Sequence, residues 1–267
     1  MPRFLLSVSV MNPFEQQAPV EGIKKIILVG SGKGGVGKST VTVNLAKKLQ
    51  QKGHKVGLLD ADIYGPSIPR MLGAINQKPE VDENNKILPI QRQGIKIMSM
   101  GFMVPENQAL VWRGPMLFKA IDQFFRDVKW GELDFLIIDL PPGTGDVALT
   151  IAQKVPIDGA IVVTTPQNMS LSDAKKALDM FDRVNAKVLG VIENMSYLRV
   201  DGQDEPVQLF PKGELEVFLK SKNLKKIAEI PFHPHVGLAS ESGIPMVESY
   251  PDSPESLAFE QLAQSLV

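Results

Sequence analysis

The chain has 267 residues, of which 43% are hydrophobic and 22% are charged, as in an ordinary globular protein of one large domain or two small ones. Its 29 Lys and Arg residues nearly balance its 30 Asp and Glu residues, which disfavours a nucleic acid or an anionic membrane as the partner. The sequence contains no cysteine, which excludes disulfides and thiolate metal sites within these residues, and no apolar run approaches the roughly 20 residues that span a bilayer.

Residues 1–22 precede the first predicted strand. One Arg comes before a short apolar run, as in a signal peptide, but no small-residue cleavage site follows it cleanly. Met11 would itself be a sensible translation start. We predict a flexible N-terminal extension over residues 1–22 and a single folded domain over residues 23–267.

The first predicted strand, residues 24–30, leads into a glycine-rich loop that opens a helix. The loop matches the G-x-x-x-x-G-K-[ST] pattern with Gly32-Lys33-Gly34-Gly35-Val36-Gly37-Lys38-Ser39. It also lies in the strand–loop–helix context that a phosphate-binding loop requires. The glycines let backbone N–H groups turn toward phosphates, and the helix N-terminus adds its positive end. We expect Lys38 to reach the β- and γ-phosphates and Ser39 to bind Mg²⁺, and we assign Thr40 to the same nucleotide-binding loop.

Apolar residues at helical spacing follow the loop, and a buried strand is predicted over residues 54–60. Asp60 and Asp62 lie at the carboxyl end of this strand, where doubly wound sheets place their ligands. We predict that Asp62 orients the attacking water and that Asp60 supports the Mg²⁺ shell. Capping and turn formation are the alternative roles for both carboxylates.

The stretch from Gly65 to Pro115 is rich in Pro and Met and interrupts the alternation of strands and helices. We predict a hairpin or an excursion there rather than a second domain. A helical pattern follows, and then an apolar strand over residues 133–139 that ends in Asp139. Given the phosphate loop upstream, we predict that Asp139 holds Mg²⁺ through water and that the backbone amide of Gly143 senses the γ-phosphate.

Two more buried strands are predicted over residues 158–165 and 186–194, with a helix from Ser170 to Val184 between them and a last helix from Pro254 to Leu266. This alternation predicts an α/β fold, a doubly wound, mostly parallel sheet with helices on both faces. Asn194 closes the last of these strands and is predicted to read an adenine edge, although such a residue often only forms a turn. No N-K-x-D motif supports guanine.

Six blocks of the sequence carry a resemblance that extends from about Ile23 to the C-terminus. They are VGSGKGGVGKST, LLDADIYGPSIPRMLG, VWRGPM, WGELDFLIIDLPPGTGDVALT, VTTPQ and GVIENMSY. Together they resemble the Mrp (ApbC-type) family, a branch of the MinD/ParA-like deviant-Walker ATPases. The resemblance implies that residues 23–267 are a P-loop ATPase domain, and that the protein is a homodimer that uses ATP and Mg²⁺ in iron–sulfur cluster assembly, with assembly factors or client proteins as partners.

The resemblance also accounts for the second lysine of the loop. It implies that Lys33 reaches across the dimer to the nucleotide of the other subunit. A cation supplied in this way would stabilise the charge that develops during γ-phosphoryl transfer, as an arginine finger does. We therefore predict Lys33, Lys38 and Asp62 as the catalytic residues, with a solvated surface lysine as the alternative for Lys33.

This sequence departs from the family at the cluster ligands. Family members that carry a cluster have a C-x-x-C motif soon after the ENMSY block, whereas Val200 and Gln203 stand approximately there in this chain. Iron–sulfur clusters are held by thiolates, so these residues cannot hold one in the manner of the family. His233 and His235 flank a proline, and we predict them to be polar turn residues rather than metal ligands.

Two functions remain open from the sequence. One is an ATP-hydrolysing dimer in iron–sulfur cluster assembly, with the cluster held by a partner. The other is a nucleotide-gated switch that binds a partner through the Met-rich segment Met98 to Met116, although core packing is the favoured role of that segment. Membrane cycling is disfavoured because the last 15 residues contain no Lys or Arg. We expect a cytoplasmic protein with no nucleic-acid or membrane partner.

Overall fold

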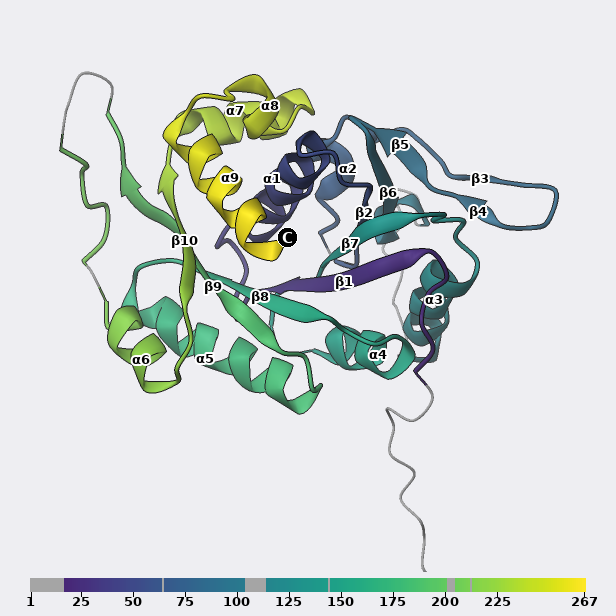
Figure 1. The fold of residues 1–267 in the computed structure, drawn as a ribbon, viewed down its shortest axis with the longest axis horizontal. Helices are drawn as coiled ribbons and strands as arrows, with labels where there is room; N and C mark the ends of the chain where they lie inside the picture. Colours follow the sequence, from purple (N-terminus) through teal and green to yellow (C-terminus); the bar gives the residue numbers. More distant parts are fainter. Residues whose placement is uncertain (1–16, 64, 104–113, 144, 201–204, 212) are drawn as a thin grey trace, which may run out of the picture.

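The computed structural model describes residues 17–63, 65–103, 114–143, 145–200, 205–211 and 213–267. Its main sheet consists of eight strands: β1 (Ile23–Gly30), β2 (Val56–Asp60), β5 (Ile90–Arg92), β6 (Ile95–Ser99), β7 (Leu133–Asp139), β8 (Gly159–Thr164), β9 (Val188–Leu198) and β10 (Lys226–Phe232). The strand order is β10-β9-β8-β1-β7-β2-β6-β5, as Figure 1 shows. Every neighbouring pair is parallel except β5 with β6 at one edge.

Helices cover both faces of the sheet, so the predicted fold class is confirmed (Figure 1). One face carries α1 (Lys38–Gln51), α2 (Ile68–Met71), α7 (Pro234–Ser242), α8 (Met246–Ser249) and α9 (Pro254–Leu266). The other carries α3 (Gly114–Arg126), α4 (Asp146–Lys154), α5 (Asn168–Arg183) and α6 (Leu215–Ser221). Side chains of β1 alternate between the two cores: Leu28 packs on the α4–α5 side and Val29 on the α1–α9 side, as the two-residue period of a strand requires.

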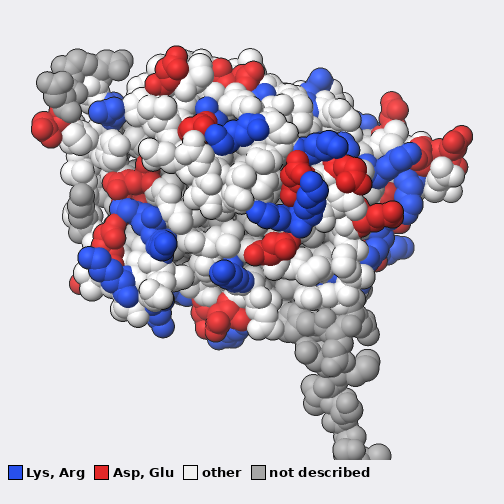
Figure 2. All heavy atoms as spheres, viewed as in Figure 1, with Lys and Arg blue, Asp and Glu red and all other residues white. Residues whose placement is uncertain are grey.

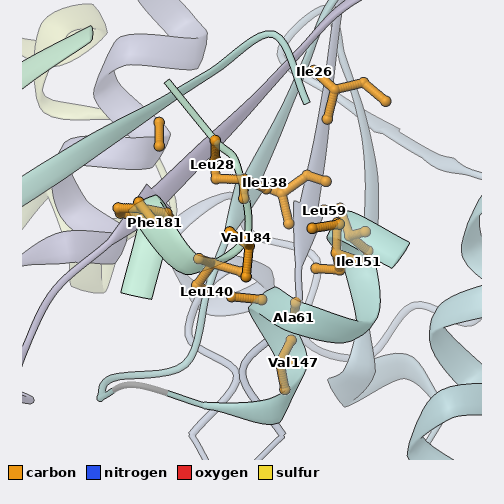
Figure 3. Packing of buried hydrophobic residues seen from close by; sticks show 14 of the residues in the cluster. Ile26, Leu28, Leu59, Ala61, Ile138, Leu140, Val147, Ile151, Phe181 and Val184 are labelled. Carbon is orange, nitrogen blue, oxygen red and sulfur yellow. The ribbon is translucent and has the colours of Figure 1, made fainter. Parts of the chain in front are cut away.

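The central strands are fixed by a fully buried core between the sheet, α4 and α5. Figure 3 shows Leu28, Leu59 and Ile138 of β1, β2 and β7 beside Ile151 of α4 and Phe181 of α5. Burying each such side chain contributes about 1.5–3 kcal/mol. In this register Asp139 of β7 lies opposite Val29 of β1 on one side and Asp60 of β2 on the other. The packing therefore holds together the carboxyl ends of β1, which leads into the phosphate loop, and of β2 and β7, which carry predicted site residues.

The prediction for residues 65–115 was incomplete. A separate hairpin does form there, from β3 (Glu80–Val81) and β4 (Ile87–Leu88). However, β6 pairs in parallel with β2, and β5 pairs with β6, so part of this segment extends the main sheet. Residues 104–113 of the Met-rich segment lie outside the described residues.

The end of the predicted N-terminal extension packs against the domain. Val20 is buried, and the backbone N–H of Ala18 donates a hydrogen bond to the carbonyl of Lys154 at 3.1 Å. Residues 1–16, which make up the rest of the predicted extension, lie outside the described residues.

Figure 2 shows basic and acidic side chains interspersed over the viewed side of the molecule. None of the helices in the described ranges has the length and apolar character needed to cross a bilayer.

Candidate functional site

The phosphate loop runs from the end of β1 to the start of α1 and is held closely on two sides. A Cβ atom on Gly32 would lie 1.8 Å from the backbone carbonyl oxygen of Asp173 in α5. A Cβ atom on Gly37 would lie 2.3 Å from Nδ2 of Asn194, which lies within β9 rather than at its end as predicted, and the φ of Gly37 is +79°. Only glycine fits at these two positions, so the loop packs closely against α5 and β9. Gly34 and Gly35, between them, are exposed.

Three side chains of α1 converge on the carboxylate of Asp139, which is fully buried. Lys38 Nζ lies 2.8 Å from Asp139 Oδ2, and Ser39 Oγ donates a hydrogen bond to the same oxygen at 2.5 Å. Thr42 Oγ1 donates to Asp139 Oδ1 at 2.8 Å. The structure thus brings Lys38, Ser39 and Asp139 together, as the sequence-based assignment requires. Thr42 was missed, although its position one helical turn after Lys38 was a usable signal.

Asp60 lies beside this group. Its carboxylate is buried and accepts hydrogen bonds from the backbone N–H groups of Asp62 and Ile68, both at 3.2 Å, and from Ser99 Oγ at 3.1 Å. Burial, and next the charge of Asp139, raise the pKa of Asp60 from 3.8 to about 8 and outweigh the two backbone donors and the charge of Lys38, which lower it. Ser99, on a strand that the sequence did not predict, is a further neighbour of the site.

Oxygen donors suitable for Mg²⁺ are present, namely the Ser39 hydroxyl and the carboxylates of Asp139 and Asp60. In the described part of the chain, no three His, Asp, Glu or Cys side chains converge as a self-sufficient metal site. Mg²⁺ keeps several waters and is commonly bound by one or two protein groups together with substrate phosphates, so the donor set fits Mg²⁺ delivered with a nucleotide.

Substituting Asp60 by Asn is expected to change how stability depends on pH. Between about pH 4 and about pH 8 the unfolded chain ionises Asp60 while the folded protein keeps it protonated, so the folded state holds more protons and the free energy of unfolding falls as pH rises through this window. The Asn variant lacks this decrease. Urea unfolding of the nucleotide-free proteins in EDTA at pH 5, 7 and 9 measures it, and equal pH slopes for the two proteins would contradict the assignment.

Asp62 and Gly143 occupy turns at the carboxyl edge of the sheet. Asp62 Oδ1 accepts a hydrogen bond from the backbone N–H of Gly65 at 3.2 Å, which corresponds to the alternative role of Asp62 in a turn. The predicted role of Asp62 in orienting the attacking water stays a prediction. The N–H of Gly143 donates to the carbonyl of Ser31 at 3.0 Å, and Gly143 has a φ of +99°. The predicted γ-phosphate sensor is therefore tied directly to the phosphate loop.

Asn194 contacts the phosphate loop from β9, whereas Lys33 is a residue of the loop itself. Asn194 is buried and its Nδ2 donates to the Val36 carbonyl at 2.8 Å, so it braces the loop; contact with adenine stays a prediction. Lys33 is half-buried, and its carbonyl accepts a hydrogen bond from Ser31 Oγ at 2.9 Å. Among the described residues, no ion pair to Lys33 Nζ is found, and its reach across a dimer stays a prediction.

The candidate metal ligands outside the loop have structural roles. His233 caps α7, where its Nδ1 accepts the backbone N–H of His235, and the His235 ring stacks on Tyr250 with centroids 4.0 Å apart. The expectation that the two histidines shape a turn is in keeping with this geometry. Val200 follows β9 with 37% of its surface exposed, whereas Gln203 lies outside the described residues.

Comparisons with known proteins agree with the fold and the loop. The protein-family model described as "ParA: NUBPL iron-transfer P-loop NTPase" matches residues 22–267. The iron–sulfur cluster carrier protein of Aquifex aeolicus is 50% identical over 256 residues, which cover 96% of this chain and 70% of that protein. The mitochondrial iron–sulfur protein required for NADH dehydrogenase of Arabidopsis thaliana is 46% identical, with 93% of this chain and 79% of that protein covered.

Solved structures give the same result. A nucleotide-binding protein from Archaeoglobus fulgidus in complex with ADP has a TM-score of 0.76 and 39% identity, covering 90% of this chain and 93% of that one. The septum site-determining protein MinD from Pyrococcus horikoshii, complexed with Mg-ADP, has a TM-score of 0.67 and 25% identity, covering 91% and 96%.

Proposed function

This chain belongs to the iron-transfer P-loop NTPases of the ParA type, and from that membership we propose that it is a homodimeric, Mg²⁺-dependent ATPase that acts in iron–sulfur cluster assembly. The observation that carries the proposal is the convergence of Lys38, Ser39 and Thr42 on the buried carboxylate of Asp139, next to the glycine-rich loop. The fold alone would not require this arrangement, because removing Lys38 and Asp139 from water costs desolvation free energy that an apolar pair would not cost.

The proposed roles follow from where each side chain lies. The N–H groups of Gly32 to Thr40 cradle the phosphates, and Lys38, which sits against Asp139, offers its charge to the β- and γ-phosphate oxygens. Ser39 and Asp139 would hold Mg²⁺, with Asp60 supporting its shell, and the bound ion would neutralise phosphate charge. Asp62 orients the attacking water, Gly143 contacts the γ-phosphate, and Asn194 reads adenine.

The cluster is the cargo in this proposal, and its ligands come from a partner. The 267 residues contain no cysteine, so thiolate ligation must be supplied by an assembly factor or a client protein. The names of the relatives support an iron–sulfur cluster as the cargo, since these relatives are named iron–sulfur cluster carrier proteins. We place the protein in the cytoplasm, a reducing compartment in which cluster-bearing thiolates persist.

The test is a reconstituted assay that follows ATP turnover and cluster transfer in one mixture. Lys38→Ala is expected to abolish nucleotide binding and, with it, both activities, because the phosphates lose their main cation. Lys220→Ala, which removes an exposed lysine of α6, is the matched control and is expected to behave as wild type. Turnover by Lys38→Ala at the wild-type rate would overturn the proposed site.

A nucleotide-gated switch without any cluster is the second candidate, and the Met-rich segment favours it in part. Met98 and Met100 fill the core, whereas Met103 and Met116 are 38% and 49% exposed and offer an adaptable apolar surface. Nucleotide-dependent binding of a partner in the absence of iron would support the switch. Anaerobic reconstitution of the purified chain with iron and sulfide is expected to yield no stoichiometric cluster; a stable cluster would contradict ligation by a partner.

A further inference from the structure

The carboxyl end of β9 is irregular next to the phosphate loop. Ile230 of β10 pairs with Asn194, but Phe232 pairs with Leu198, so two steps along β10 correspond to four along β9. Met195 lies at the start of this bulge and has a φ of +55°. Left-handed backbone is unfavourable for a residue with a Cβ atom, and methionine has no short polar side chain to stabilise it. Such strained positions cluster at functional sites, where the surrounding structure holds them in place.

The bulge directs Met195 to the phosphate loop. A Cβ atom on Gly37 would lie 3.6 Å from Met195 Cε, so the thioether end of the side chain lies beside the last glycine before α1. The preceding residue, Asn194, is hydrogen-bonded to the Val36 carbonyl from the same side. Met195 is half-buried, so the loop covers part of the side chain and the rest remains accessible. Bulges commonly re-aim a side chain in this way beside active sites.

A nucleotide whose phosphates lie along the loop N–H groups must place its base beyond the loop. The surface that adjoins Val36 and Gly37 is the end of β9, which offers the polar amide of Asn194 and the thioether of Met195 side by side. Small-molecule sites combine an apolar wall with a few placed polar groups, and thioethers make favourable contacts with aromatic rings.

We infer that Met195 forms an apolar wall of the base site, against which the purine ring packs, and that the strained backbone at this position is retained because it aims the side chain there. The inference rests on the proposed nucleotide binding and gives a role to a residue of the GVIENMSY block for which the sequence predicted none.

The experiment separates the strain from the contact. Met195→Gly removes the side chain and relieves the strain, because glycine adopts a positive φ at little cost, whereas Met195→Ala removes the thioether and keeps the strain. Gln93→Gly, at another non-glycine residue with a φ of +55°, is the matched control for relief of strain away from the loop. Each variant is compared with wild type by thermal unfolding and by titration with ATP and with tripolyphosphate, which has no base.

Met195→Gly is expected to unfold at or above the wild-type temperature and yet to bind ATP about three- to tenfold more weakly, with tripolyphosphate affinity unchanged. Met195→Ala is expected to show the same loss of ATP affinity without any gain in stability, and Gln93→Gly to bind both ligands as wild type does. Equal weakening of ATP and tripolyphosphate would show that Met195 only supports the loop and would overturn the inference, as would unchanged ATP affinity. A wild-type chain that fails to bind ATP contradicts the proposed function itself.

Discussion

Lys33→Ala is expected to lower the rate of ATP hydrolysis by about 10³-fold or more while ATP affinity stays close to that of wild type. In the proposed site, Lys38, which pairs with Asp139, and the loop N–H groups supply the attraction for the phosphates within one subunit. Lys33 is half-buried, and in the proposed dimer its charge meets the γ-phosphate of the other subunit. Steady-state turnover and equilibrium binding of ATP measure the two quantities separately.

Mixing two inactive variants tests whether Lys33 acts across the dimer. A Lys33→Ala subunit retains a nucleotide site but lacks the cation, and a Lys38→Ala subunit retains the cation but lacks the nucleotide site. Their mixed dimer contains one complete site, so the mixture is expected to recover a substantial part of wild-type turnover. Turnover no greater than the sum of the separate variants, or wild-type turnover by Lys33→Ala alone, would rule out the role in trans.

Gly32→Ala is expected to damage both stability and nucleotide binding. The new Cβ atom would lie 1.8 Å from the carbonyl oxygen and 2.2 Å from the carbonyl carbon of Asp173, and both are backbone atoms that can move only if the loop or α5 moves. Overpacking of this kind costs about 1–3 kcal/mol, which lowers the unfolding temperature by roughly 2–12 °C for a domain of this size. Displacement of the loop should also weaken ATP binding strongly.

Gly34→Ala is the matched control for this prediction. It adds the same methyl group two residues along the same loop, but its nearest neighbour would be Pro142 Cγ at 3.9 Å, an ordinary contact distance. Gly34→Ala is therefore expected to unfold within about 1–2 °C of wild type, since substitutions away from a packing conflict change stability by less than about 0.5 kcal/mol. Equal unfolding temperatures for the two variants would show that the loop is not held against α5 as described.

The parts of the fold that the sequence predicts are those with a strong local signal. The strand at residues 133–139 and the helix at residues 254–266 were predicted with the bounds that the structure has, because each combines a regular apolar pattern with clear end signals. By contrast, β10 was not predicted. Its sequence, KIAEIPF, includes charged residues, and it is stabilised as a strand by pairing with β9 and by packing against α9.

The residues of the site, too, were predicted only where a local sequence pattern marks them. The loop motif identified Lys38 and Ser39 directly, and a strand-end carboxylate identified Asp139. Thr42 and Ser99 belong to no motif, and their hydrogen bonds to Asp139 and Asp60 span 97 and 39 residues of sequence. Such contacts depend on the strand order of the sheet, which a single sequence does not specify.

The hydrogen bond from Gly143 to Ser31 limits how well this protein distinguishes a triphosphate from a diphosphate. One N–H serves one acceptor well at a time, so in the proposed site a γ-phosphate oxygen replaces the Ser31 carbonyl, whereas ADP leaves the bond at 3.0 Å intact. Exchanging a neutral acceptor for a charged one yields about 1–2 kcal/mol, or roughly a tenfold preference. In the proposed site Gly143 alone would therefore set a modest affinity gap, and a sharper difference between the two nucleotide states would require the second subunit of the proposed dimer.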